Sequence, residues 1–226
     1  MKLSAFTLKA LKNFSVINEG IKFNKGNIQQ VVAGNEELHA SCTLPDEFPR
    51  AFNLMNVSKF IANVETFSDA PELEFTDHFV KIRGNAGSVI YGYAGNNVVK
   101  GYDEEFADPG YDISFKMSKD TLIRIQKFAS INVSPNTALV SENKEYFVKA
   151  YDKKETTASV ARLSLGKSDV DDFSIDFRTD NLSKLLDADY QVDLHQNELA
   201  RFTYTEGASN IVYHLAADLQ TQREGE

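Results

Sequence analysis

The sequence lacks the features that secreted and membrane proteins need. It contains a single cysteine, Cys42, so an internal disulfide is excluded, and this usage is typical of a reducing compartment. No apolar run approaches the length of a membrane span, and the N-terminus has no apolar stretch of the signal-peptide type. We therefore expect no membrane partner, and we expect Cys42 to be a small core residue.

Positive charge is also scarce. The chain has 24 Lys and Arg residues against 33 Asp and Glu, which gives a net charge of −9. This balance argues against a nucleic-acid partner only if the charge is evenly spread, because a few focused cations act locally on an acidic protein. The positions of the cations therefore matter more than their number.

Patterns that would indicate an enzyme are missing. Gly166-Lys167-Ser168 resembles the end of a phosphate-binding loop, but Ala161 stands where that loop requires glycine. The acidic run from Asp169 to Asp172 lacks the glycine and the glutamate of a calcium loop. No histidine has a second ligand at metal-binding spacing, and we expect all four at the surface or at strand edges: His39, His78, His195 and His214. We expect no catalytic residue, no metal and no cofactor.

One helical element occurs twice in the chain. Leu8 to Asn18 and Leu122 to Asn132 match in register, and every matched pair is separated by 114 positions. The pairs are Leu8 and Leu122, Leu11 and Ile125, Phe14 and Phe128, Ile17 and Ile131, and Asn18 and Asn132. The serines that could cap the two helices, Ser4 and Ser118, keep the same offset.

The order of elements also repeats. Each copy of the helix is followed by strands, a second helix and three more strands, with the second helices expected at Val57 to Phe67 and Asp180 to Leu186. A stretch from Gly95 to Gly110 is rich in Gly, Asn, Asp and Glu and is too long for a turn, which marks a linker. We predict an α+β chain with two similar domains, residues 1–98 and 112–226, joined by a linker at 99–111.

The first domain is expected to open with a hairpin. Ile21 to Phe23 and Ile28 to Val32 are separated by the turn residues Asn24-Lys25-Gly26. A loop is expected from Pro45 to Pro49, between two further strands.

The predicted helices carry cations and few acids. A lysine on the polar face of one helix is usually only solvated. Four such helices in an acidic chain predict a shared electropositive surface that contacts phosphates and positions a duplex without reading bases. The predicted DNA-binding residues are Lys9, Lys12, Lys59, Lys119, Arg124, Lys127 and Lys184.

The N-terminal run resembles the sliding clamps of T-even-type bacteriophages. The close match lies in Met1 to Ser4, Ala10 to Phe14 and Ile17 to Ile21, while length, repeat and element order agree over the whole chain. The resemblance implies the DNA-clamp fold in a homotrimeric ring, with helices around a central hole and strands outside. The implied partners are double-stranded DNA bound without sequence preference, the replicative DNA polymerase, a clamp loader ATPase and late transcription factors, in the cytoplasm of an infected bacterium.

The same resemblance implies two protein contacts. Ser88 to Ala94 of one protomer would pair with Ser159 to Leu165 of the next, so that the interface includes Ser88, Ile90, Ser159, Ala161 and Leu163. Partner peptides would dock at the linker residues Tyr102 and Phe106, which could equally be staples that hold the linker down. The competing class is a non-enzymatic DNA-binding or structural phage protein that binds openly instead of by encirclement; an enzyme is the third alternative.

Overall fold

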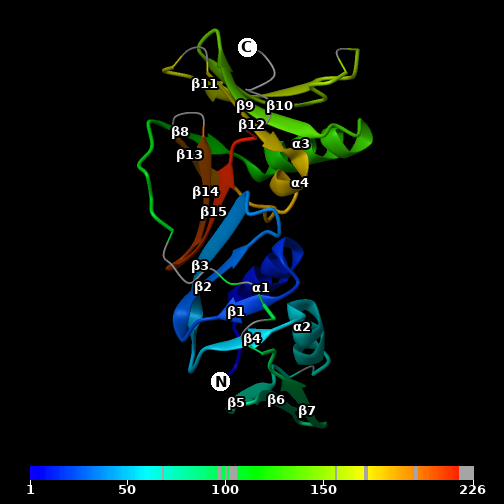
Figure 1. Cartoon of the computed structure of the whole chain (residues 1–226). Coiled ribbons are helices and arrows are strands. Elements are labelled where there is room, and N and C mark those ends of the chain that lie inside the picture. Colours follow the sequence, from blue (N-terminus) through cyan, green and yellow to red (C-terminus); the bar gives the residue numbers. More distant parts are fainter. Residues whose placement is uncertain are drawn as a thin grey trace. The chain divides into compact units, whose positions relative to one another are not determined.

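The chain folds into two compact units (Figure 1). The computed structural model describes residues 1–67, 69–95, 98–99, 101, 106–155, 157–170, 173–195 and 198–218. Unit 1 consists of Met1–Phe106 with Thr205–Ile211, and unit 2 consists of Ala107–Tyr204 with Val212–Glu226. In the described part of the chain, no helix has both the length and the apolar character to cross a membrane.

Unit 1 contains two helices that lie side by side, α1 (Ala5–Ile17) and α2 (Val57–Glu65) (Figure 1). As predicted, Ser4 caps α1, because its hydroxyl accepts a hydrogen bond from the Thr7 amide at 3.2 Å. Asn56 caps α2 in the same way, accepting from the Lys59 amide at 2.7 Å. The helical spacing of Leu11 and Phe14 turns both side chains inward, and both are fully buried.

The strands of unit 1 form three small antiparallel groups. β1 (Ile21–Phe23) pairs with β4 (Phe52–Leu54), and β2 (Gly26–Val32) pairs with β3 (Leu38–Phe48). β5 (Glu72–Phe75), β6 (Phe79–Gly84) and β7 (Gly87–Gly92) form a third group in that order.

The predicted first hairpin and the predicted loop are both wrong. β1 pairs with β4 instead of β2. The reason is that the buried side chain of Gln29 hydrogen-bonds to the backbone of the turn that follows β1. The Gln29 amide donates to the carbonyls of Asn24 and Gly26 and accepts from the Asn24 amide, so these groups need no ladder partner. The predicted loop at Pro45 lies inside β3, which runs to Phe48.

Aromatic packing holds these groups together. The ring of Phe23 stacks on Phe52 at 4.5 Å and meets Phe48 edge-on at 5.1 Å. Cys42 is buried in β3, as predicted, and burial raises the pKa of its thiol.

Unit 2 contains the helix α3 (Lys119–Ile131), which packs on β10 (Glu145–Tyr151) and β11 (Ala161–Lys167). Its sheet has the order β11-β10-β9-β12 and is completed by β9 (Asn136–Glu142) and β12 (Phe173–Arg178). A second run has the order β15-β14-β13-β8, formed by β8 (Ile113–Met117), β13 (Tyr190–His195), β14 (Leu199–Glu206) and β15 (Ser209–Ala216).

The second helix of unit 2 is shorter than predicted. α4 covers only Thr179–Leu182. Its cap position is Arg178, whose side chain has no acceptor atom for the first helical amides. The following residues make bonds to the third residue back, Lys184 to Asn181 and Leu185 to Leu182, so the segment tightens into turns.

Equivalent residues in the two copies of the repeated helix differ in how deeply they are buried. Phe14 of α1 is fully buried, whereas its counterpart Phe128 of α3 is 42% exposed. Ile17 is 4% exposed and its counterpart Ile131 is 65% exposed. The C-terminal half of α3 therefore presents an apolar flank that α1 does not.

Candidate nucleic-acid interface and subunit edges

The two predicted lysines of α1 are both ion-paired within unit 1. Lys9 Nζ lies 3.0 Å from Glu206 Oε2, and Lys12 Nζ lies 2.6 Å from Glu65 Oε1. Both pairs are partly solvent-exposed, so each contributes little to stability and can exchange its partner. Lys59 adds an exposed cation in the first turn of α2, the neighbouring helix.

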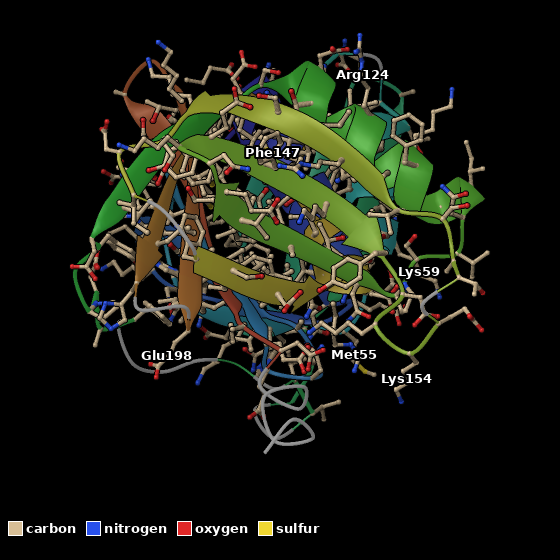
Figure 2. All side chains as sticks on the ribbon, turned by 90° about the horizontal axis from the view of Figure 1, so that it is seen from above. Met55, Lys59, Arg124, Phe147, Lys154 and Glu198 are labelled. Carbon is tan, nitrogen blue, oxygen red and sulfur yellow. The ribbon has the colours of Figure 1, made fainter. Side chains whose placement is uncertain are left out.

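The predicted cations of unit 2 lie on or after its helices. Lys119, Arg124 and Lys127 are exposed on α3, and Arg124 points away from the helix into solvent (Figure 2). Arg124 Nε lies 3.0 Å from Asp120 Oδ2, one turn earlier. Lys184 follows α4 and is half-buried. The predicted cations of each unit thus lie on, or directly after, two contacting helices. The fold also places carboxylates beside several of these cations.

β7 is an edge strand of unit 1, because it ends the order β5-β6-β7. Tyr91 faces α2, where its hydroxyl donates to the Asn56 carbonyl at 2.7 Å and its ring lies 5.8 Å from that of Phe60. Ile90 points to the opposite face and is 62% exposed, and Ser88 is also exposed. The backbone N–H and C=O groups along the free side of β7 are therefore available for pairing with another strand. One face of β7 is turned toward α2 and the other is open to solvent.

β11 is an edge strand of unit 2 with a similar arrangement. Leu163 pairs with the buried Val148 on the face that α3 covers, and Ala161 lies on the same face. Ser159 precedes the strand and is exposed. The helix α3, which carries the exposed Phe128 and Ile131, packs against this strand. These two residues were not predicted to lie at an interface.

The described part of the linker contains an aromatic stack. The ring of Phe106 lies 5.2 Å from that of His39, at an angle of 16°. His39 is buried, contrary to the prediction that it lies at the surface or at a strand edge, because its position in β3 turns it inward, beside Gln30 at 3.2 Å and beneath Phe106. Burial lowers the pKa of His39 to about 4. Tyr102, the other predicted docking residue, lies outside the described residues.

A pocket of about 360 Å³ adjoins this stack, entirely within unit 1. Besides His39 and Phe106, its lining consists of Asn18, Val32, Ala33, Gly34, Glu36 and Gly101. A hollow of this size, with a wall that is more apolar than polar and carries one acid, Glu36, is suited to the side chain of a peptide.

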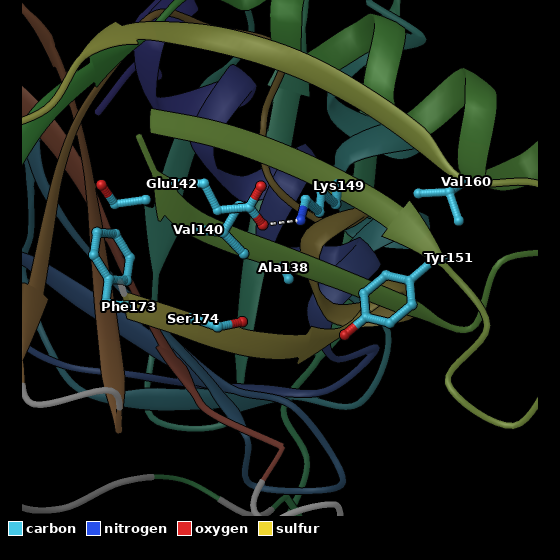
Figure 3. A pocket seen from close by; sticks show the side chains of 9 residues that line it. Ala138, Val140, Glu142, Lys149, Tyr151, Val160, Phe173 and Ser174 are labelled. Carbon is cyan, nitrogen blue, oxygen red and sulfur yellow. Dashed lines mark hydrogen bonds and ion pairs between the residues drawn. The ribbon is translucent and has the colours of Figure 1, made fainter. Parts of the chain in front are cut away.

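A second hollow of about 490 Å³ lies on the sheet of unit 2 (Figure 3). Ala138 and Val140 form its small apolar floor, and the Glu142 carboxylate is held by Lys149 and, at 2.9 Å, by Arg162. These internal ion pairs neutralise its charges, so no charged ligand is specified. Among the residues that the structure describes, no group of three or more His, Cys, Asp or Glu could hold a metal ion.

No family model matches the chain. Two curated relatives match most of its length. The sliding clamp of Vibrio phage KVP40 is 25% identical over 209 residues, which is 89% of this chain and 94% of the relative. The sliding clamp of Escherichia phage RB69 is 23% identical over 173 residues, which is 76% of each protein.

Solved structures share the fold at low sequence identity. The proliferating cellular nuclear antigen (PCNA) of Entamoeba histolytica has a TM-score of 0.73 at 10% identity, covering 93% of this chain and 94% of that one. A. fulgidus PCNA bound to the C-terminal region of FEN-1 has a TM-score of 0.68 at 10% identity, covering 96% of each chain.

The chain has the DNA-clamp fold. In sequence it is similar to the sliding clamps of T-even-type bacteriophages, which confirms the resemblance seen in the N-terminal run. Both relatives are named as sliding clamps and not as enzymes, which agrees with the prediction that the chain is not an enzyme.

Proposed function

We propose that the chain forms a homotrimeric ring that encircles duplex DNA and tethers the replicative polymerase during processive synthesis. The observation that carries this proposal is that β7 of unit 1 and β11 of unit 2 are both edge strands, and that both carry apolar side chains. An uncovered edge invites pairing with another chain. Head-to-tail pairing of β7 with β11 of the next protomer uses two different patches, and such contacts close into a ring when the rotation allows it.

The apolar flank of α3 supports the same contact. Phe128 and Ile131 would be covered by the neighbouring protomer, which explains why they are exposed in a single chain when Phe14 and Ile17 are buried. Ser88, Ile90, Ser159, Ala161 and Leu163 would lie at this joint. The two clamp domains of each protomer would be residues 1–98 and 112–226, with the linker at 99–111.

The cations on the helices would face the DNA. Lys9, Lys12 and Lys59 of one unit and Lys119, Arg124, Lys127 and Lys184 of the other would line the hole. A sparse set of lysines attracts a uniform lattice of phosphates without fixing a register, which sliding requires. The net charge of −9 would discourage DNA from binding elsewhere on the surface.

The pocket beside Phe106 would receive apolar side chains of partner peptides. This use is supported by its size and by the A. fulgidus PCNA structure, which holds a partner's C-terminal region. The partners would be the polymerase, an ATP-driven clamp loader and late transcription factors, in the cytoplasm of an infected bacterium. Tyr102 and Phe106 would take part in this contact.

A loading experiment tests the ring. The protein is loaded on nicked circular duplex DNA with a phage clamp loader and ATP, washed in high salt, and the circle is then cut. A ring survives the salt and leaves only after cutting, whereas an open DNA-binding protein is lost in the salt itself. Sedimentation provides a second measurement: three chains of 25.3 kDa predict a mass of about 76 kDa, and a protein that remains a monomer at all concentrations contradicts the proposal.

A further inference from the structure

The carboxylates that pair with the lysines of α1 come from distant parts of the sequence. Glu65 is the last residue of α2, and Glu206 ends β14, 197 positions from Lys9. Neither acid is a neighbour of its lysine along the helix, so the fold of unit 1 places each carboxylate beside the ammonium group.

Local stability does not account for these acids. Glu65 stands at the C-terminus of α2, where the helix dipole disfavours a negative charge. Glu206 is exposed, and exposed ion pairs add little to the stability of a fold. What the acids do is neutralise two of the three predicted DNA-binding cations of unit 1.

We propose that Glu65 and Glu206 compete with DNA phosphates for Lys12 and Lys9, and so lower the affinity of the clamp for duplex DNA. The proposal rests on the proposed function, because it assumes that α1 faces DNA. Each ammonium group must leave its carboxylate before it can neutralise a phosphate, so fewer counterions are released per contact. The contacts become weak and short-lived, which favours sliding over holding. In unit 2, Arg124 also has a competing carboxylate, but this one comes from Asp120, one turn earlier on the same helix.

The test uses the full-length protein with Glu65→Gln, Glu206→Gln or both. Binding to a short fluorescent duplex is measured by anisotropy at several salt concentrations. Each substitution is expected to tighten binding about two- to five-fold, because the competing pair is removed. The slope of log affinity against log salt should steepen by up to about 0.9 for each lysine released.

Two control variants separate competition from other effects. Glu198→Gln makes the same change in net charge at an exposed position of unit 2 that lies well away from Arg124 (Figure 2). It should leave the salt slope unchanged. Lys12→Gln breaks the same ion pair as Glu65→Gln but should weaken DNA binding.

The outcomes are distinct. If the pair only links α1 to α2, Glu65→Gln and Lys12→Gln lower the unfolding midpoint equally and neither tightens DNA binding, which overturns the proposal. A gain for Glu65→Gln and Glu206→Gln no larger than that for Glu198→Gln also overturns it. The ring itself is judged separately, since a wild-type protein lost in the salt wash refutes encirclement whatever the glutamate variants do.

Discussion

Phe14 and Phe128 occupy equivalent positions in α1 and α3, yet Phe14 is fully buried and Phe128 is 42% exposed. The same side chain thus serves as core in unit 1 and as surface in unit 2. A buried phenylalanine stabilises the fold of its own chain, whereas an exposed one beside an edge strand is available to a neighbouring protomer.

Truncation of these two rings should affect stability by different amounts. Phe14→Ala should lower the free energy of unfolding by about 3–5 kcal/mol, because it leaves a cavity in a packed core. Phe128→Ala should lower it by at most about 1.5 kcal/mol in dilute solution, where protomers are separate, since less buried apolar surface is removed. Urea unfolding measures both values, and sedimentation should show weaker assembly for Phe128→Ala alone. Equal destabilisation by the two substitutions would contradict the assignment of Phe128 to an interface.

A charge on the edge strand of unit 1 should separate the protomers. Ile90→Glu places a carboxylate at the proposed joint, where burial without a partner is unfavourable, so the protein should sediment as a monomer with an unchanged circular dichroism spectrum. Ile28→Glu is the matched control, because Ile28 is 59% exposed in β2 and Ile90 is 62% exposed in β7. Both variants behaving as full trimers would exclude β7 from the interface.

Removal of the exposed cations of α3 should weaken loading on DNA and leave the assembly intact. Lys119→Ala, Arg124→Ala and Lys127→Ala together remove three cations that would meet phosphates, which should reduce the salt slope of DNA binding by about 0.9 for each cation removed. A smaller reduction per cation is expected for Lys9→Ala with Lys12→Ala, because Glu206 and Glu65 compete with phosphates for these two lysines in the wild-type protein. Loss of folding, seen in the thermal unfolding curve, would instead show that these side chains support the core.

The stability of unit 1 should depend on pH through His39. Burial holds the pKa of His39 at about 4 in the folded protein, against its ordinary value of 6.5 in an unfolded chain. Between these values the unfolded chain binds the extra proton and the folded chain does not, so stability is full above pH 6.5 and falls as the pH drops towards 4. His39→Gln should flatten this part of the curve of unfolding free energy against pH. His78→Gln, at an exposed turn, should preserve it, and a wild-type slope in His39→Gln would contradict the assignment.

Truncation of the linker aromatic should weaken peptide binding. Phe106→Ala removes the ring that stacks on His39 and forms one wall of the pocket, so the affinity for a clamp-binding peptide of the polymerase should fall about ten-fold or more, as for an aromatic hot spot. Val98→Ala, which truncates an exposed apolar residue just before the linker, should bind normally. If Phe106 is only a staple, its removal should lower the unfolding midpoint and leave peptide affinity unchanged once the protein is folded.

Local signals in the sequence predicted the helices of the first half of each repeat. Ser4 and Ser118 each stand just before an apolar stripe of helical spacing, and both cap a helix in the structure. The pairing of β1 with β4 could not be predicted in this way, because it depends on contacts across the chain and on the buried Gln29 that closes the intervening turn. The length of α4 was overestimated because the apolar pattern of its residues is the same for a helix and for tight turns.

The sequence predicted the cations of the candidate site but not the carboxylates beside them. The cations were found because they share helices, and a helix is a local feature. Their carboxylate partners were missed because Glu206 reaches Lys9 through the fold, across 197 positions of sequence. The exposure of Phe128 was missed for the same reason, since what surrounds a side chain is decided by the elements packed against its helix.

The buried Cys42 has a practical consequence for measuring movement on DNA. Its thiol is enclosed in β3 and its pKa is raised by burial, so it contributes little of the thiolate that reacts with maleimides at neutral pH. A cysteine added at an exposed position such as Glu198 would then be the single reactive group of the chain. One fluorophore per protomer could be attached without replacing any native residue of the core, and diffusion along a stretched duplex could be followed molecule by molecule.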